Sequence, residues 1–238
     1  MIERKQYRAC LKAGWKQEQL EEEVEAAAKT AHDAVESGDI LTASLYRHKD
    51  MCFLYYEALK KNIGPTDFLD PLTPFLEEWP EENGKTPWAY MYHIFHHSVP
   101  EDIAEWTRER TEGKKRIGRI AFLWPDRVFS YVRWHQAIVE EGLLKGDKYQ
   151  CISLHENILF SYFEEPRMKA PRGKPSSVCS ASEPLVLRPL RHLPHIPASL
   201  ACERGIPIFF LSSLYIISVK LICPSISVPL YIFLYSFP

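Results

Sequence analysis

A tyrosine and a histidine spaced four residues apart are the strongest candidates for chemistry in this sequence. Tyr131 and His135 lie in segment 127–141, where apolar residues recur at helical spacing. Residues four apart lie one turn apart on the same side of a helix. A phenol and an imidazole in that position can hold one hydroxyl group between them and exchange a proton with it, so the pair predicts an acid–base site. The competing interpretation makes His135 a core residue of an apolar stripe, predicted to be Val128, Val132, His135 and Val139.

The spacing of the residues that could bind a metal does not predict a common site. On a strand, His93 and His97 would share a face while His96 points away, and no acidic residue or cysteine stands at a ligand spacing beside them. The six cysteines form no CxxC pair. We therefore expect no metal site and no organic cofactor, and we expect reduced thiols in a cytoplasmic protein.

The elements that would position the Tyr–His helix occur twice. A strand at 119–123 precedes the helix, for which Asp126 is the expected N-cap and Gly142 the residue that ends it. In the first copy a strand at 7–11 precedes a helix over about 17–37. That first helix also has a histidine at the corresponding place.

Each helix is followed by a hairpin of the same design, at 41–59 and at 149–166. Aromatic and branched residues bounded by polar turns are typical of strands. The matched positions are Cys52-Phe53-Leu54-Tyr55-Tyr56-Glu57 and Leu159-Phe160-Ser161-Tyr162-Phe163-Glu164. The first copy continues with a proline-broken helical stretch at 67–79 and a strand at 88–95, which completes the βαββαβ order of a ferredoxin-like unit.

Strand parity indicates that both faces of these hairpins are buried. Phe160 and Tyr162 point to one face, whereas Leu159 and Phe163 point to the other. A lone ferredoxin-like sheet needs helices on one side only, so the second face must meet another sheet. The other copy is the obvious candidate, and a homodimer of the whole chain is the alternative that the sequence leaves open.

Composition divides the chain near residue 167. The 238 residues are 46% hydrophobic and 25% charged with a net charge of −2, which is typical of a globular protein and gives no electrostatic case for nucleic-acid binding. Ten of the 18 prolines follow Arg167, and 206–238 carries one charge, Lys220. Its uncharged run at 205–219 is short for a membrane span, so we expect a disordered or aberrant tail, from a shifted reading frame or another exon, rather than an anchor.

Segment 119–166 resembles the L-rhamnose mutarotase family of the dimeric α/β-barrel superfamily. The shared features are the first strand, a helix with Y-x-x-x-H (Tyr131, His135), and an L-F-x-Y-x-E strand at 159–164. The resemblance implies acid–base roles for Tyr131 and His135 in interconverting the anomers of a free sugar. It implies that Phe160 and Tyr162 bind the sugar.

The first copy and the end of the second depart from the family pattern. The family also uses tryptophans on the second helix of the unit, and the second copy stops before that helix. In the first copy His32 matches the histidine, but Ala28 stands in the place of the tyrosine.

Together these observations predict an α+β fold of two tandem ferredoxin-like (dimeric α/β-barrel) units. The first unit spans 1–100, a linker spans 101–118, the second, incomplete unit spans 119–166, and a non-homologous tail spans 167–238. The expected function is that of a sugar mutarotase-like isomerase with no cofactor and a small-molecule sugar as its partner. The alternatives are a non-catalytic ligand-binding or interaction protein, and a haem-binding or cofactor-free monooxygenase of the same superfamily.

Overall fold

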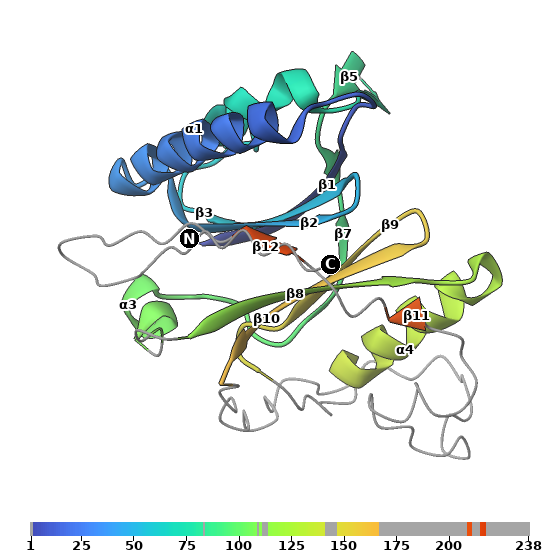
Figure 1. Cartoon of the computed structure of the whole chain (residues 1–238). Helices are drawn as coiled ribbons and strands as arrows, with labels where there is room; N and C mark the ends of the chain where they lie inside the picture. The colour runs from blue at the N-terminus through green and yellow to red at the C-terminus, as the bar shows by residue number, and fades with distance from the viewer. Residues whose placement is uncertain are drawn as a thin grey trace.

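The computed structural model describes residues 2–82, 84–108, 110, 114–140 and 147–166, and the backbone of 209–210 and 215–217. In this part of the chain two five-stranded antiparallel sheets lie face to face, with helices on their outer sides (Figure 1). The fold is therefore α+β, as the sequence predicts. None of the described helices is both long enough and apolar enough to cross a bilayer.

The first sheet has the strand order β12-β2-β3-β1-β6. The predicted helix is α1, whose alanine-rich inner side packs on this sheet and which ends before Gly38, a glycine with φ of +72°. The predicted hairpin at 41–59 is confirmed as β2 and β3. The elements up to residue 90 are β1 (Glu3–Cys10), α1 (Gln17–Glu36), β2 (Ile40–His48), β3 (Met51–Ala58), α2 (Thr66–Leu69), η1 (Asp70–Phe75), β4 (Trp79–Glu81), β5 (Gly84–Thr86) and β6 (Ala89–Tyr90), of which β4 and β5 form a separate two-stranded sheet.

The second sheet has the strand order β11-β8-β10-β9-β7. The predicted hairpin at 149–166 is confirmed as β9 and β10, and α4 covers the outer face of this sheet (Figure 1). The elements after residue 91 are β7 (Tyr92–His96), α3 (Ile103–Thr107), β8 (Lys115–Phe122), η2 (Pro125–Arg127), α4 (Val128–Glu140), β9 (Cys151–His155), β10 (Ile158–Glu165), β11 (Phe209–Phe210) and β12 (Tyr215–Ile217), of which β12 belongs to the first sheet. The predicted linker at 101–118 thus contains the short helix α3 and the start of β8.

One predicted strand, at 88–95, is two strands that belong to different sheets. β6 pairs with β1 in the first sheet, and after Met91 the chain continues as β7, which pairs with β9 in the second sheet. The backbone of the tail makes the reciprocal exchange: β11 pairs with β8, and β12 pairs with β2. These five residues of the predicted tail take part in both sheets, and the rest of the tail prediction lies outside the described residues.

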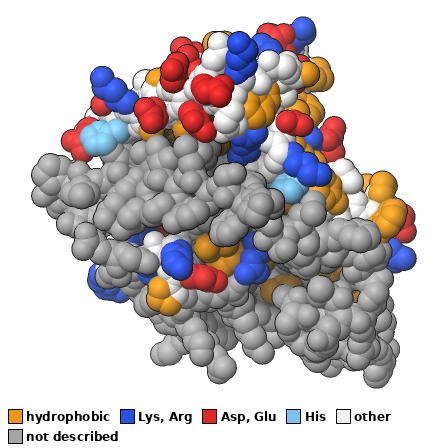
Figure 2. Space-filling model, viewed as in Figure 1, with side chains coloured by type: hydrophobic (Ala, Val, Ile, Leu, Met, Phe, Trp, Pro, Cys, Tyr) orange, Lys and Arg blue, Asp and Glu red, His pale blue; other side chains and the backbone are white. Residues whose placement is uncertain are grey.

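Aromatic side chains fill the space between the two sheets. Tyr55 of β3 stacks on Tyr162 of β10 with ring centroids 3.6 Å apart, and Phe160 contacts the rings of Tyr46 and Phe53. The second sheet of the same chain, rather than another copy, covers the inner face of the first. The outer surface over α1 is acidic, with exposed Glu18, Glu22 and Glu25 (Figure 2).

At two contacts between the sheets, a large side chain from one sheet meets a small residue from the other. Gln6 of β1 pairs with Tyr55, and Gly118 of β8 holds the corresponding place opposite Tyr162. Where Gln6 stands, its partner from the other sheet is the small Ser153, to which it is hydrogen bonded. Where Gly118 stands, the ring of Tyr46 fills the space. Each of these two contacts therefore combines one larger and one smaller residue.

Candidate active site

Helix α4 carries the predicted catalytic pair and starts later than the sequence suggests. A 3-10 turn at Pro125–Arg127 precedes α4, and the expected N-cap residue Asp126 lies inside that turn, where its carboxylate is 3.2 Å from Arg127 Nε. A proline at the first position of a turn fixes its φ, which favours the turn beginning there. The predicted helix end at Gly142 lies outside the described residues.

The buried side of α4 differs in part from the predicted stripe. Val128, Tyr131 and Ile138 pack against the cluster formed by the outer face of the second sheet. Val139, expected on that stripe, is exposed. Tyr131 and Ile138 remove more apolar area from water than Val139 would, so this orientation buries the larger side chains.

Tyr131 and His135 lie side by side, as their spacing predicts. Their ring centroids are 4.2 Å apart, and the ring of Phe95 from β7 meets His135 edge-on at 5.8 Å. His135 Nδ1 is 3.0 Å from the carbonyl oxygen of Tyr131. Because a carbonyl can only accept, Nδ1 carries the proton, and Nε2 of the neutral imidazole is left as an acceptor.

Burial gives the two side chains complementary protonation states. It lowers the pKa of His135, so the imidazole is neutral at neutral pH, and the hydrogen bond to Tyr131 only partly offsets this shift. Burial raises the pKa of Tyr131, so the phenol keeps its proton. The pair therefore presents one donor, Tyr131 Oη, and one acceptor, His135 Nε2.

The predicted sugar-binding residues lie on the other face of the same sheet. Phe160 and Tyr162 point into the inter-sheet core and are fully buried, whereas Tyr131 and His135 lie on the α4 side. The sequence places Phe160 and Tyr162 on a shared face, which is confirmed, but the structure does not bring them together with Tyr131 and His135.

The remaining histidines form no second site in the described residues. Three or more metal-binding side chains do not come together anywhere among them. His93 is the most buried of its cluster, and burial lowers its pKa to about 4. On α1, the side chain of His32 is 43% exposed and lies 3.9 Å from Asp33, with Ala28 one turn away, so the first helix holds no equivalent of the Tyr–His pair.

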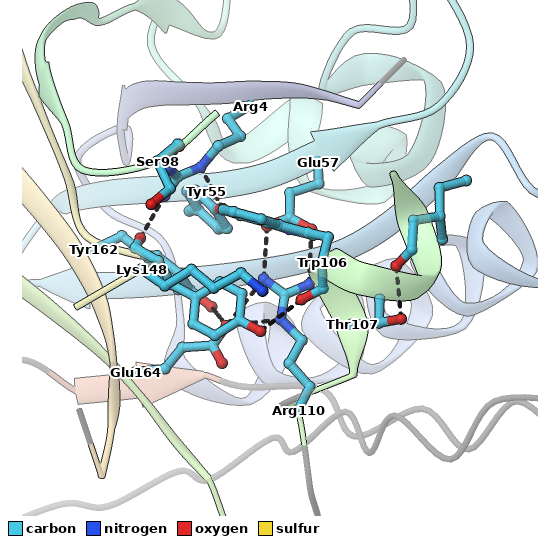
Figure 3. Close-up of polar contacts among 12 residues, drawn as sticks. Arg4, Tyr55, Glu57, Ser98, Trp106, Thr107, Arg110, Lys148, Tyr162 and Glu164 are labelled. Atoms are coloured by element: carbon cyan, nitrogen blue, oxygen red, sulfur yellow. Dashed lines mark hydrogen bonds and ion pairs between the residues drawn. The ribbon is translucent and has the colours of Figure 1, made fainter. Parts of the chain in front are cut away.

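A buried ionic network between the sheets is the main feature that the sequence analysis missed. Arg110, from the predicted linker, lies between Glu57 of β3 and Glu164 of β10 (Figure 3). The hydroxyl groups of Tyr55 and Tyr162 donate to these two carboxylates at 2.5 and 2.8 Å. The signal was present in the repeat, since a Tyr-x-Glu sequence ends both matched strands.

Opposite charges dominate this network. Burial alone would raise the pKa of the Glu57 carboxyl, but Arg110, with smaller contributions from Arg4 and the Tyr55 hydroxyl, outweighs it, and that pKa is lowered to about 2. Burial alone would lower the pKa of Arg110, but Glu164 and Glu57 raise it well above its usual value. Glu57 and Arg110 are therefore both ionised at neutral pH.

Comparison with protein-family models, with curated proteins and with solved structures found no match to this chain.

Proposed function

We propose that the two sheets belong to two ferredoxin-like units arranged as in the dimeric α/β-barrel superfamily. The strand orders β2-β3-β1-β6 and β9-β10-β8-β11 support this, because they are the same order built from matching elements. The reciprocal pairing of β7 and β12 with the opposite sheets supports a pseudo-two-fold arrangement within one chain.

On this scaffold the chain acts as a mutarotase-like isomerase on a free sugar. The observation that carries the proposal is the complementary state of the pair: a protonated Tyr131 beside a neutral His135 whose Nε2 is free to accept. Tyr131 Oη would donate its proton to the ring oxygen of an aldopyranose while His135 Nε2 removes the proton of the anomeric hydroxyl. The bond between the anomeric carbon and the ring oxygen breaks, the aldehyde forms, and the reverse steps close the ring on either face.

The proposed setting follows from the same chemistry. Every step is a proton transfer, so the two side chains need no cofactor to supply electrons or a group. The described cysteines Cys10, Cys52 and Cys151 are free thiols, which agrees with the proposed cytoplasmic location.

Anomer exchange measured by saturation-transfer NMR on free aldoses tests the function. His135→Gln keeps a polar side chain but removes the titratable group, so we expect exchange to slow by about 10²–10⁴-fold. His32→Gln is the matched control, because it makes the same change on α1, where no tyrosine lies one turn away. Exchange that stays at the spontaneous rate with the unmutated chain would refute the proposal.

A non-catalytic, ligand-binding protein is the second candidate. The placement of Phe160 and Tyr162 on the opposite face favours it, because the predicted sugar-binding aromatics do not reach the pair. The same NMR experiment separates the two functions: a binder broadens or saturates sugar signals without accelerating exchange between anomers.

A further inference from the structure

The carboxylates between the sheets are arranged around a planar cation. Arg110 Nη1 and Nη2 donate to the two oxygens of Glu57 at 2.7 and 2.6 Å, and Arg110 Nε donates to Glu164 at 3.0 Å. Two edges of one guanidinium are thus used by two carboxylates from different sheets. This fork geometry is specific to guanidinium and related planar cations, since an ammonium group cannot match both edges.

The acceptors are held in place by groups other than Arg110. Tyr55 Oη and Trp106 Nε1 donate to Glu57 at 2.5 and 3.0 Å. Tyr162 Oη donates to Glu164 at 2.8 Å. These donors belong to the strands and to α3, so Arg110 is not the only group that orients the two carboxylates.

Aromatic faces complete the surroundings of the cation. The guanidinium carbon of Arg110 is 4.5 Å from the centroid of the Tyr149 ring and 5.8 Å from that of Trp106. Glu57 and Glu164 are 0% and 1% exposed. Two buried carboxylates facing one another are strongly destabilising without a cation between them, so the arrangement favours an occupant of positive charge.

We propose that Tyr55, Glu57, Tyr162 and Glu164 form a guanidinium-binding site shared by the two sheets, with Arg110 as its built-in ligand. The occupant comes from the segment between α3 and β8, and the site itself comes from β3 and β10. Its ligand class is therefore a guanidinium or amidinium cation with a short alkyl chain. The inference does not rest on the proposed isomerase function.

Chemical rescue of the full chain tests the site. Arg110→Ala keeps Cβ and removes Cγ, Cδ and the guanidinium group. N-ethylguanidinium has the same atoms and can replace them. We expect the variant to melt at a lower temperature and 10 mM N-ethylguanidinium to raise its Tm by roughly 3–6 °C, the shift for a ligand at about ten times its Kd. The unmutated chain, whose site is filled, should not respond. Ethylammonium chloride at the same concentration is the control for charge and ionic strength.

A second variant ties rescue to the carboxylates. In Glu57→Gln/Arg110→Ala the site has lost the carboxylate that accepts two hydrogen bonds from the guanidinium, so N-ethylguanidinium should raise the Tm by less than a third of the shift in the single variant. If Arg110→Ala does not fold alone, the yield of folded chain after refolding with and without N-ethylguanidinium is the readout, and a clear gain supports the site. Equal responses to N-ethylguanidinium and ethylammonium, or no response in either assay, would overturn the proposal.

Discussion

The two faces of the second sheet use polar groups in opposite ways. On the inner face, Tyr162 and Glu164 are fully buried, and their polar atoms are hydrogen bonded to each other and to Arg110. On the outer face, no described residue forms a hydrogen bond with the Tyr131 hydroxyl, and among the described residues only the Nδ1 atom of His135 has a hydrogen-bond partner. Polar groups with every partner supplied by the protein stabilise the fold. Groups left with unused donors and acceptors are the ones that can act on another molecule.

This comparison predicts its largest effect at the ionic network. Glu57→Gln keeps the shape of the side chain but removes its charge, so Arg110 retains one carboxylate instead of two. We expect the free energy of unfolding to fall by about 3 kcal/mol, which is typical of breaking a buried ion pair. Urea denaturation measures the change. A loss below about 1 kcal/mol would mean that the inner face depends on aromatic packing alone.

Acid should reveal the same network. The pKa of Glu57 is lowered from its usual 4.5 to about 2, so the unfolded chain binds the proton first as pH falls. The stabilisation is complete above pH 4.5 and is lost as pH falls towards 2, with a total of about 3 kcal/mol. The stability difference between the unmutated chain and Glu57→Gln should therefore narrow by about 2 kcal/mol from pH 5 to pH 3. If this stability difference stayed constant from pH 5 to pH 3, the pKa of Glu57 would not be lowered by folding.

The contact between Gly118 and Tyr46 should have an intermediate effect on the free energy of unfolding. A Cβ atom added at Gly118 would lie 2.8 Å from two ring atoms of Tyr46, inside a packed aromatic core. Gly118→Ala should therefore cost about 1–3 kcal/mol. Gly64→Ala is the control, because its nearest neighbour would be the Asp67 carboxylate at 3.8 Å, and we expect a change within about 0.5 kcal/mol. A similar loss of stability at both glycines would argue against close packing between Gly118 and Tyr46.

Sequence patterns predicted the parts of this fold that depend on neighbours along the chain. Aromatic and branched residues bounded by polar turns at 41–59 and 149–166 identified the hairpins, and their two apolar faces indicated that the sheets meet. The split of 88–95 between two sheets could not be predicted, because one strand and two collinear strands have the same alternation. Arg110 was missed for a similar reason, since its partners Glu57 and Glu164 lie more than 50 residues away on either side.

The candidate site was predictable only on one element. Helical spacing brought Tyr131 and His135 together, because both belong to α4. Strand parity grouped Phe160 with Tyr162, but it cannot tell which face of a sheet a distant helix covers. That assignment depends on long-range packing, and it separates these aromatics from Tyr131 and His135.

The smallest expected effect gives the most direct comparison of the two faces. Tyr131→Phe and Tyr162→Phe remove the same hydroxyl group from opposite sides of one sheet. At Tyr162 the change removes one of the two side chains that donate to the buried Glu164 carboxylate, so the free energy of unfolding should fall by about 1–3 kcal/mol. At Tyr131 no described partner is lost, and we expect a change within about 0.5 kcal/mol.

If the proposed isomerase function is correct, Tyr131→Phe should nevertheless slow anomer exchange by about 10²-fold or more, because it removes the proton donor. Denaturation and NMR exchange on the same two variants measure both effects. Tyr131→Phe with an unchanged exchange rate would remove Tyr131 from the mechanism, whereas a stability loss equal to that of Tyr162→Phe would show that its hydroxyl has a structural role.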